Sequence, residues 1–295
     1  AMMQARHCIA IAGWDIHSQL ELVRDPVDDD HPTRLAELLI ALLEQHPDLQ
    51  VYVLLWDFAS IYALEREALF PIDNPWEQHQ RLHFVQDDQH PPTASQHQKL
   101  VIIDGQLAFC GGFDLSRWRW DTQAHAAAEP RRVTHDGDPY QPFHDIQMLV
   151  DGEAAEALME LFRDRWRWAT EERLAAMPEQ AGQRSVWPHE VAVMLHRQAV
   201  AIARTLPAYA GRAEVREVEQ LYLDLIERAQ TLIYIENQYL SSRSLRDALC
   251  DSLTGAIGPQ IVIILPRATG GWLEQHTMDI LRARVLSRLR DADRH

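Results

Sequence analysis

Short apolar runs separated by helical patterns constrain the fold of this chain most strongly. Residues 8–13 and 51–56 are apolar enough to form buried strands, and the apolar spacing of 33–46 between them predicts a helix with Thr33 as its N-cap. Further strands are predicted at three places: 82–85, 99–104 and 107–110, the last two joined by a turn at Gly105-Gln106. A strand–helix–strand series of this kind predicts an α/β fold around a mostly parallel or mixed sheet.

The same pattern begins again in the second half of the chain. After a helix over 153–168 and a connection, the sequence predicts these elements: a helix at 213–230, a strand at 231–236, a helix at 243–253, a strand at 261–265 and a helix at 272–290. Segment 5–18 resembles 229–242, and 49–56 resembles 259–266, although any two buried strands share such apolar runs. We therefore predict two similar lobes, over 1–169 and 213–295, joined by a connecting segment over 170–212 with one strand near 198–204.

The overall charge of the chain is strongly acidic, with a formal net charge of −16. A chain of this charge is poorly suited to neutralise many phosphates, so no nucleic-acid partner is expected.

All but one of the 28 basic residues of the chain are arginine, the exception being Lys99. A GC-rich genome would favour arginine, but a lysine kept at one position also indicates a site that needs a compact ammonium rather than a planar guanidinium.

The sequence predicts neither a metal site nor a cofactor. The three cysteines are far apart, and no group of histidines and acids has convincing metal-ligand spacing. Neither a membrane-spanning run nor a secretory signal is recognisable, so we expect a cytoplasmic protein, or one that is peripheral to a membrane.

The strongest chemical signal lies in the segment 97–112. Its skeleton is His97-x-Lys99-x4-Asp104-x6-Gly111-Gly112. Because side chains alternate along an extended segment, His97 and Lys99 share one face, so that a nucleophilic imidazole and a cation converge on one point. The two glycines end the next strand and are expected to let the backbone approach a ligand closely.

This skeleton resembles the HKD motif of the phospholipase D superfamily. The resemblance implies that His97 attacks phosphorus and forms a phosphohistidine, that Lys99 holds the phosphoryl oxygens, and that Asp104 supports the local structure. It also implies a reaction that needs no metal, because cationic side chains stabilise the developing charge.

Two acidic residues are expected to complete the first half of the site. A nucleophilic histidine needs a carboxylate on its other nitrogen to fix its tautomer, and the resemblance places that carboxylate at Asp145, in 142–152. A surface aspartate before a strand is the alternative, and His144 beside it is a weaker candidate. Asp114, just after the glycines, falls where the family often carries a polar pocket residue.

Segments outside the motif resemble the branch that contains eukaryotic phospholipase D and its bacterial relatives: 111–121, 142–148 and 233–240. In the last of them Glu236, Asn237 and Gln238 follow a strand and are expected to contact substrate at the mouth of a sheet. The resemblance covers nearly the whole chain and implies a phospholipase D-like fold of two similar βα lobes with mixed sheets.

The family carries a second HKD motif, whose histidine protonates the leaving alcohol. This chain has one lysine, so it cannot hold a second motif. By analogy with the first half, the second motif would fall at about position 320, beyond His295. We expect the second lobe to be incomplete, the missing half-site to lie in a C-terminal segment, and the isolated chain to be inactive.

The function that these residues favour is cleavage or exchange of the headgroup of glycerophospholipids. The expected partners are a phospholipid at a membrane surface and an acceptor, which is water or another alcohol. Three alternatives stay open: a cardiolipin synthase-like phosphatidyltransferase, a nuclease of the same superfamily, and a non-catalytic remnant.

Overall fold

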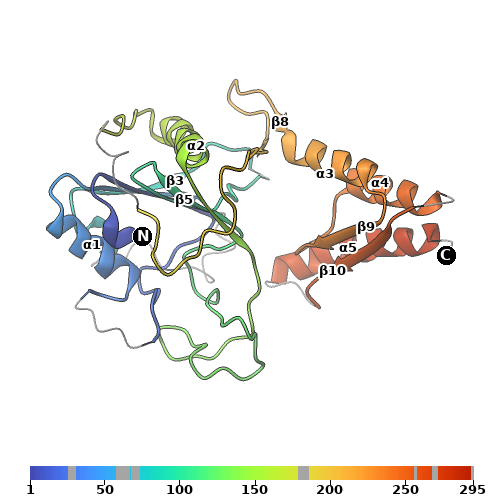
Figure 1. The fold of residues 1–295 in the computed structure, drawn as a ribbon, viewed down its shortest axis with the longest axis horizontal. Coiled ribbons are helices and arrows are strands. Elements are labelled where there is room, and N and C mark those ends of the chain that lie inside the picture. The colour runs from blue at the N-terminus through green and yellow to red at the C-terminus, as the bar shows by residue number, and fades with distance from the viewer. Residues whose placement is uncertain are drawn as a thin grey trace. The chain divides into compact units, whose positions relative to one another are not determined.

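The computed structural model of the protein describes residues 1–25, 31–57, 67, 74–92, 94–178, 186–255, 258–267 and 272–293, with side chains in the last helix from 278 onward. The chain divides into two compact units, Ala1–Val200 and Ala201–His295 (Figure 1). The boundary between them falls inside the segment 170–212 that was predicted to connect two lobes.

A six-stranded mixed sheet forms the centre of the first unit, in the order β3-β2-β1-β4-β5-β6. Its strands are β1 (Cys8–Gly13), β2 (Gln50–Trp56), β3 (Leu82–Asp87), β4 (Leu100–Ile103), β5 (Leu107–Gly111) and β6 (Gln147–Asp151). The first three strands pair in parallel, and β4, β5 and β6 are added antiparallel. The predicted mixed α/β fold is therefore confirmed.

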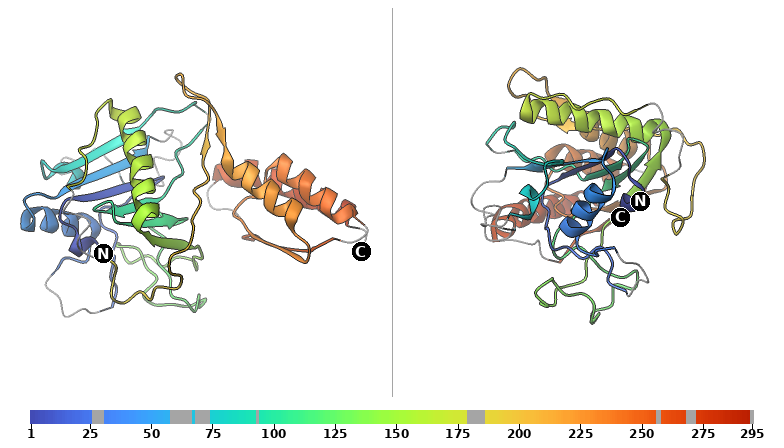
Figure 2. Two further views of the ribbon diagram at one scale, coloured as in Figure 1. Left: turned by 45° about the horizontal axis from the view of Figure 1, so that its top comes forward. Right: turned by 90° about the vertical axis from the view of Figure 1, so that its left-hand side faces the viewer.

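Two helices cover opposite faces of this sheet, α1 (Leu35–Gln45) and α2 (Gly152–Thr170), as Figures 1 and 2 show. All six residues of β1 are buried, and Ile9 and Ile11 join α1 in one apolar cluster. On the other face Ala10 pairs with Tyr52, whose ring meets Trp166 of α2 edge-on at 5.1 Å between ring centroids. The small alanines leave room for the large α2 side chains, so β1 is the most enclosed strand of the unit.

The hairpin that joins β4 to β5 turns at Asp104-Gly105. Both residues have positive φ, 51° and 67°, and the amide of Gln106 donates to the carbonyl of Ile103 over 2.9 Å. An Asp-Gly pair suits a two-residue turn of this type, because its twist matches that of the strands. The predicted turn is present, one residue earlier than expected.

The second unit has its own apolar core. It contains two short strands, β7 (Thr205–Leu206) and β8 (Val215–Arg216), followed by α3 (Glu217–Arg228), β9 (Leu232–Glu236), α4 (Arg243–Thr254), β10 (Gln260–Ile264) and α5 (Trp272–Ala292). Strands β9 and β10 pair in parallel across α4, as β1 and β2 do across α1. The repeated strand–helix–strand topology was predicted from the sequence.

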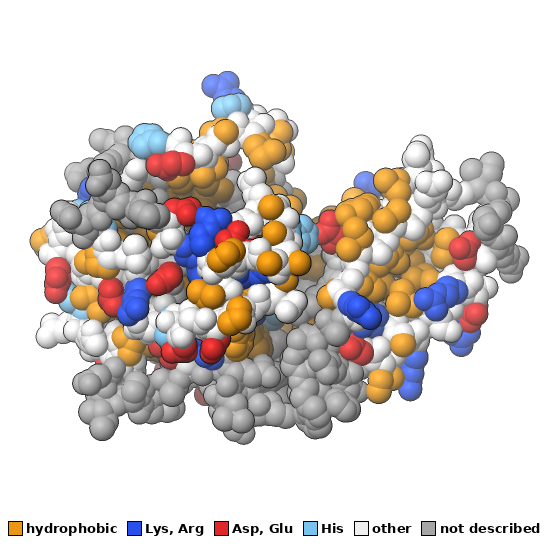
Figure 3. All heavy atoms as spheres, turned by 90° about the horizontal axis from the view of Figure 1, so that it is seen from below, with side chains coloured by type: hydrophobic (Ala, Val, Ile, Leu, Met, Phe, Trp, Pro, Cys, Tyr) orange, Lys and Arg blue, Asp and Glu red, His pale blue; other side chains and the backbone are white. Residues whose placement is uncertain are grey.

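One face of the β9–β10 pair is packed and the other is open. Ile233 and Ile235 lie in a cluster with residues of α3, α4 and α5, including Ile226 and Leu249. The alternate residues of both strands are exposed: Leu232, Tyr234, Val262 and Ile264. Figure 3 shows apolar side chains gathered on the surface of this unit. Among the described residues no helix has the length and apolar character needed to cross a membrane.

Two local predictions are wrong. The N-cap of α1 is Arg34 rather than the predicted Thr33, and it makes no side-chain capping hydrogen bond. The strand expected near 198–204 is absent from those residues, and the short β7 follows them instead, because its residues pair with Val215 and Arg216. Strand pairing depends on a partner that is distant in the sequence, so local apolar content did not predict the position of this strand correctly.

The close approach of β6 to Gly111 predicts a strong effect of adding one methyl group. A Cβ at Gly111 would lie 2.3 Å from the carbonyl oxygen of Ile146, so Gly111→Ala must displace the start of β6. We expect a loss of about 2–4 kcal/mol in the free energy of unfolding, measured by urea denaturation. Gly137→Ala is the control, since a Cβ added there would have nothing within 4 Å and only the φ of +88° opposes the change. Equal losses in the two variants would contradict this account of Gly111.

Candidate active site

Lys99 is held in place by a buried ion pair. Its Nζ lies 3.2 Å from Oδ2 of Asp114, and the two side chains are 5% and 3% exposed. The same Nζ donates to the carbonyl of His97 over 3.1 Å. Burial lowers the pKa of Lys99, and the adjacent Asp114 carboxylate opposes that shift. The ammonium therefore has a fixed position at the end of the sheet.

Asp114 also binds the chain at the end of β1. Its Oδ1 accepts hydrogen bonds from the amides of Trp14, at 2.9 Å, and Asp15, at 3.2 Å. The sequence predicted Asp114 as a polar residue that binds substrate. In the structure its two carboxylate oxygens contact Lys99 and the backbone, so Asp114 is a positioning residue rather than a group that faces substrate.

His97 lies beside this ion pair and keeps contact with solvent. Partial desolvation by the surrounding protein, reinforced by the positive charges of Lys99 and Arg119, lowers the pKa of His97 to about 4, although Asp114 opposes the shift. The ring of Trp14 lies 6.3 Å from the imidazole, centroid to centroid. At neutral pH the imidazole is therefore uncharged, which is the state that a nucleophile requires.

Asp104 has the supporting role that the resemblance implied, and the structure gives its contacts. Its carboxylate accepts hydrogen bonds from the amides of Arg6, at 2.9 Å, and of His7 and Cys8, each at 2.8 Å. These amides lead into β1, so Asp104 ties the turn of the motif hairpin to the first strand. The carboxylate also adds to the burial that raises the pKa of the Cys8 thiol to about 12.

Asp145 lies near the predicted site, but it does not make the predicted contact. A Cβ on Gly112 would lie 2.0 Å from Oδ1 of Asp145, so the carboxylate packs directly against that glycine. Oδ1 accepts from the amide of Ile146 over 2.7 Å, and within the described part of the chain no hydrogen bond joins Asp145 to His97. The negative charge of Asp145 nevertheless acts on Lys99, because it partly opposes the lowering of the Lys99 pKa by burial.

The two glycines of the motif need a corrected explanation. They were expected to let the backbone approach a ligand, but protein atoms fill the space beside both of them. A Cβ on Gly111 would meet β6, and one on Gly112 would meet Asp145. The glycines therefore allow close packing of the 145–147 segment against the end of β5.

The arginines of 117–132 divide into two kinds. Arg131 and Arg132 are engaged in protein contacts, since Arg132 pairs with Asp121 over 2.9 Å and Arg131 pairs with Glu129 over 2.9 Å. Arg119 is different, because its charge lowers the pKa of both His97 and Lys99. Its positive charge therefore acts on both of the motif side chains that the resemblance assigns to the reaction.

A second buried ion pair supports the histidine segment, and sequence reasoning missed it. Nε of Arg165 in α2 lies 2.7 Å from Oδ2 of Asp87, and Nη1 donates to Oε1 of Gln98 over 3.3 Å. Gln98 stands between His97 and Lys99, so α2 helps to hold the motif in place. The sequence did carry one sign that this arginine is buried, because Arg165 occupies the same helix face as the apolar Leu158 and Phe162.

The candidates of the second unit have local roles. Oδ1 of Asn237 accepts from the amides of Tyr239 and Leu240, at 2.9 and 2.7 Å, which closes the turn after β9. Oε1 of Glu236 accepts from the hydroxyl of Tyr234 over 2.6 Å, and Gln238 is exposed. A role for Glu236, Asn237 and Gln238 in binding substrate stays a prediction.

The arrangement in the first unit can perform nucleophilic displacement at phosphorus. A neutral imidazole supplies the attacking nitrogen, and the Lys99 ammonium beside it can stabilise negative charge on phosphoryl oxygens. Within the described ranges, no group of three or more histidine, cysteine or acidic residues is arranged to hold a metal ion.

Comparison with known proteins agrees with this chemistry. A family model described as phospholipase D matches residues 1–252. The chain belongs to the phospholipase D family. It is 26% identical to phospholipase D alpha 1 of Zea mays, over 83% of this chain and 38% of that protein, and 27% identical to phospholipase D beta 2 of Arabidopsis thaliana, over 56% of this chain and 22% of that protein.

The chain thus spans less than half the length of these curated relatives. Among solved structures, phosphatidylserine synthase of Haemophilus influenzae matches 89% of this chain and 57% of its own, at 12% identity and a TM-score of 0.47.

The lowered pKa of His97 predicts its titration. Since the folded pKa of about 4 lies below the ordinary value of 6.5, the ring should stay neutral as the pH falls from 7 and should gain its proton only near pH 4. Lys99→Met should raise the midpoint, because it removes a nearby positive charge. Histidine NMR signals recorded over pH 3–8 measure both values. A midpoint near 6.5 in the folded wild-type protein would contradict the proposed desolvation.

The three amide contacts of Asp104 predict its contribution to stability. In Asp104→Ala the amides of residues 6–8 lose their acceptor, so we expect a loss of about 2–4 kcal/mol in urea denaturation. Asp104→Asn should lose less, because it keeps one oxygen and tolerates positive φ. Asp138→Ala, at an exposed position, should change stability by less than about 0.5 kcal/mol. If Asp104→Ala lost no more stability than the Asp138→Ala control, the hydrogen bonds between Asp104 and the amides of residues 6–8 would contribute little to the free energy of unfolding.

Proposed function

We propose that this protein is a phosphodiesterase of phospholipase D type that cleaves or exchanges the headgroup of glycerophospholipids. The observation that supports it most is the neutral His97 imidazole beside a lysine that Asp114 holds in place. Family membership and the plant relatives support the same class of reaction.

In the first step a nitrogen of His97 attacks the phosphorus of the lipid. A nitrogen–phosphorus bond forms and the bond from phosphorus to the headgroup oxygen breaks, which releases the headgroup as an alkoxide that must take a proton. Lys99 stabilises the negative charge on the phosphoryl oxygens while this occurs. The proton is expected from a second histidine, as the family resemblance implies.

In the second step an acceptor resolves the phosphohistidine. Attack by water releases phosphatidic acid and restores the imidazole, whereas attack by another alcohol releases a lipid with a new headgroup. We expect Arg119 to attract an anionic group near the reacting phosphate, because its charge acts on His97. The substrate lies in a bilayer, so the protein acts at a membrane surface as a peripheral protein.

The covalent intermediate provides the direct test. Brief incubation with a soluble nitrophenyl phosphodiester, whose nitrophenolate leaves without needing a proton from the missing second histidine, followed by an alkaline quench and peptide mass analysis, should locate the phosphoryl adduct on His97. His97→Ala should form no adduct, because the attacking nitrogen is lost. Lys99→Arg should slow adduct formation by roughly 10²–10³-fold, since a planar guanidinium cannot replace a compact ammonium in the space beside Asp114.

The matched control is His196→Ala, which changes an exposed histidine outside the motif and should leave adduct formation unchanged. An adduct on another residue would overturn the role of His97. A Lys99→Arg rate within about threefold of wild type would overturn the role of Lys99. In a protein that also contains the second motif, release of phosphatidic acid from phosphatidylcholine vesicles, compared with cleavage of DNA, then distinguishes a lipid substrate from a nucleic acid.

A further inference from the structure

Two histidines that the proposed reaction does not use face each other in the long loop between β5 and β6. Nε2 of His125 lies 3.4 Å from Nδ1 of His144. The ring centroids are 5.2 Å apart, and the ring planes are nearly perpendicular, at 83°. Both side chains are exposed, and 19 residues separate them in the sequence.

Asp121 sets the orientation of the first of these rings. Its Oδ2 lies 3.2 Å from Nδ1 of His125. The same carboxylate accepts from the amides of Thr122 and Phe143 and from Nη1 of Arg132, so it acts as an acceptor throughout. Nδ1 of His125 therefore carries the proton, and the lone pair of Nε2 is directed toward His144.

The spacing of the two rings fits a shared metal ion. Zinc binds imidazole nitrogens at about 2.0–2.1 Å, so two tetrahedral ligands have nitrogens about 3.3–3.4 Å apart. In such a site each ring centroid lies about 3.2 Å from the metal, which places the centroids about 5.2 Å apart. Two rings that pointed straight at each other with the same nitrogen separation would have centroids at about 5.7 Å. Both observed distances match the convergent arrangement.

We propose that His125 and His144 form a binding site for a zinc-like divalent transition metal, with Asp121 as the carboxylate that orients His125. Two imidazoles supply the protein ligands, and water completes the coordination. A histidine that donates its second nitrogen to a carboxylate is the usual arrangement around bound zinc. No step of the proposed reaction passes through this site.

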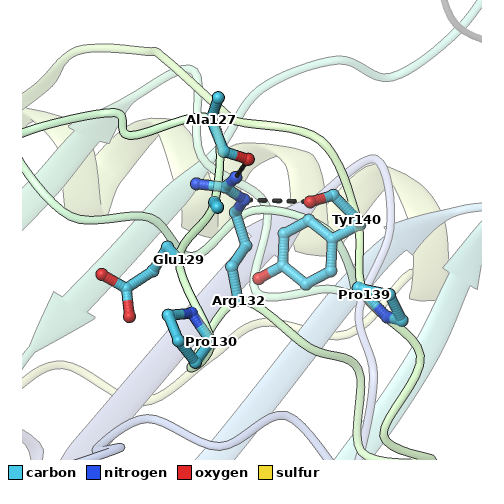
Figure 4. Close-up of a pocket in the computed structure, with 7 residues that line it drawn as sticks. Ala127, Glu129, Pro130, Arg132, Pro139 and Tyr140 are labelled. Carbon is cyan, nitrogen blue, oxygen red and sulfur yellow. Dashed lines mark hydrogen bonds between the residues drawn. The ribbon is translucent and has the colours of Figure 1, made fainter.

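The surrounding loop is already ordered by a buried arginine. Arg132 donates from Nε to the carbonyl of Tyr140 and from Nη2 to the carbonyl of Ala127, each over 2.9 Å, and all three residues line the pocket in Figure 4. Because these contacts preorganise the loop, little conformational entropy is lost when metal binds. The metal would join the middle of the loop, at His125, to its end at His144, next to Asp145.

Isothermal titration of the protein with zinc chloride tests the site. Wild type should bind one zinc ion that His125→Ala and His144→Ala each weaken by at least about tenfold. His196→Ala, the matched control, should bind as wild type does, and magnesium should not compete, because imidazole ligands select against hard cations. Cobalt should give the visible absorption of a tetrahedral ion in wild type, and either substitution at the pair should remove it.

Circular dichroism of the metal-free variants checks that each one is folded, and His125→Gln and His144→Gln serve as replacements if an alanine variant is not. No zinc binding by wild type would overturn the proposal. Equal binding by wild type and by both pair variants would also overturn it, because the zinc would then be held by other residues among the 15 histidines.

Discussion

The candidate active site depends on one constraint, which is that two buried carboxylates fix both ends of β1 to the hairpin that carries the motif. Asp104 binds the amides of residues 6–8 at the start of the strand, and Asp114 binds those of Trp14 and Asp15 at its end. The second carboxylate also binds Lys99. The position of the ammonium is therefore set by the same contacts that hold the central strand.

A buried ion pair contributes less to stability than its short distances suggest, because both charges lose their water. Its value here is geometric, since it holds a cation beside a neutral imidazole where solvent is partly excluded. The Arg165–Asp87 pair acts in a similar way on the other side of the motif, because Arg165 also donates to Gln98 between His97 and Lys99. Together the two pairs connect β1, β3, β4 and α2 around one short segment.

Much of this could be predicted from the sequence, because local patterns carry the information. Short apolar runs predicted β1, β2, β9 and β10, and the glycine at 105 predicted the hairpin turn to within one residue. The motif spacing identified His97, Lys99 and Asp104. The neighbours of Asp145 and of the two glycines were not predictable, since they depend on how closely β6 approaches β5, which no local pattern records. The partner of Arg165 lies 78 residues away in the chain, and the strand predicted near 198–204 failed for the same reason.

By itself, the sequence determined the class of fold and the family, and it predicted the residue that attacks phosphorus, because strand periodicity and motif spacing are properties of neighbouring residues. Only the tertiary structure decided which carboxylate pairs with Lys99, what fills the space beside Gly111 and Gly112, and that His125 faces His144 across a long loop. Those contacts join segments that are distant in the chain, and their distances are set by how the sheet and its loops pack. Burial, charge and hydrogen bonding then act on the imidazole and the ammonium through space, so their protonation follows from the fold and not from their order in the sequence.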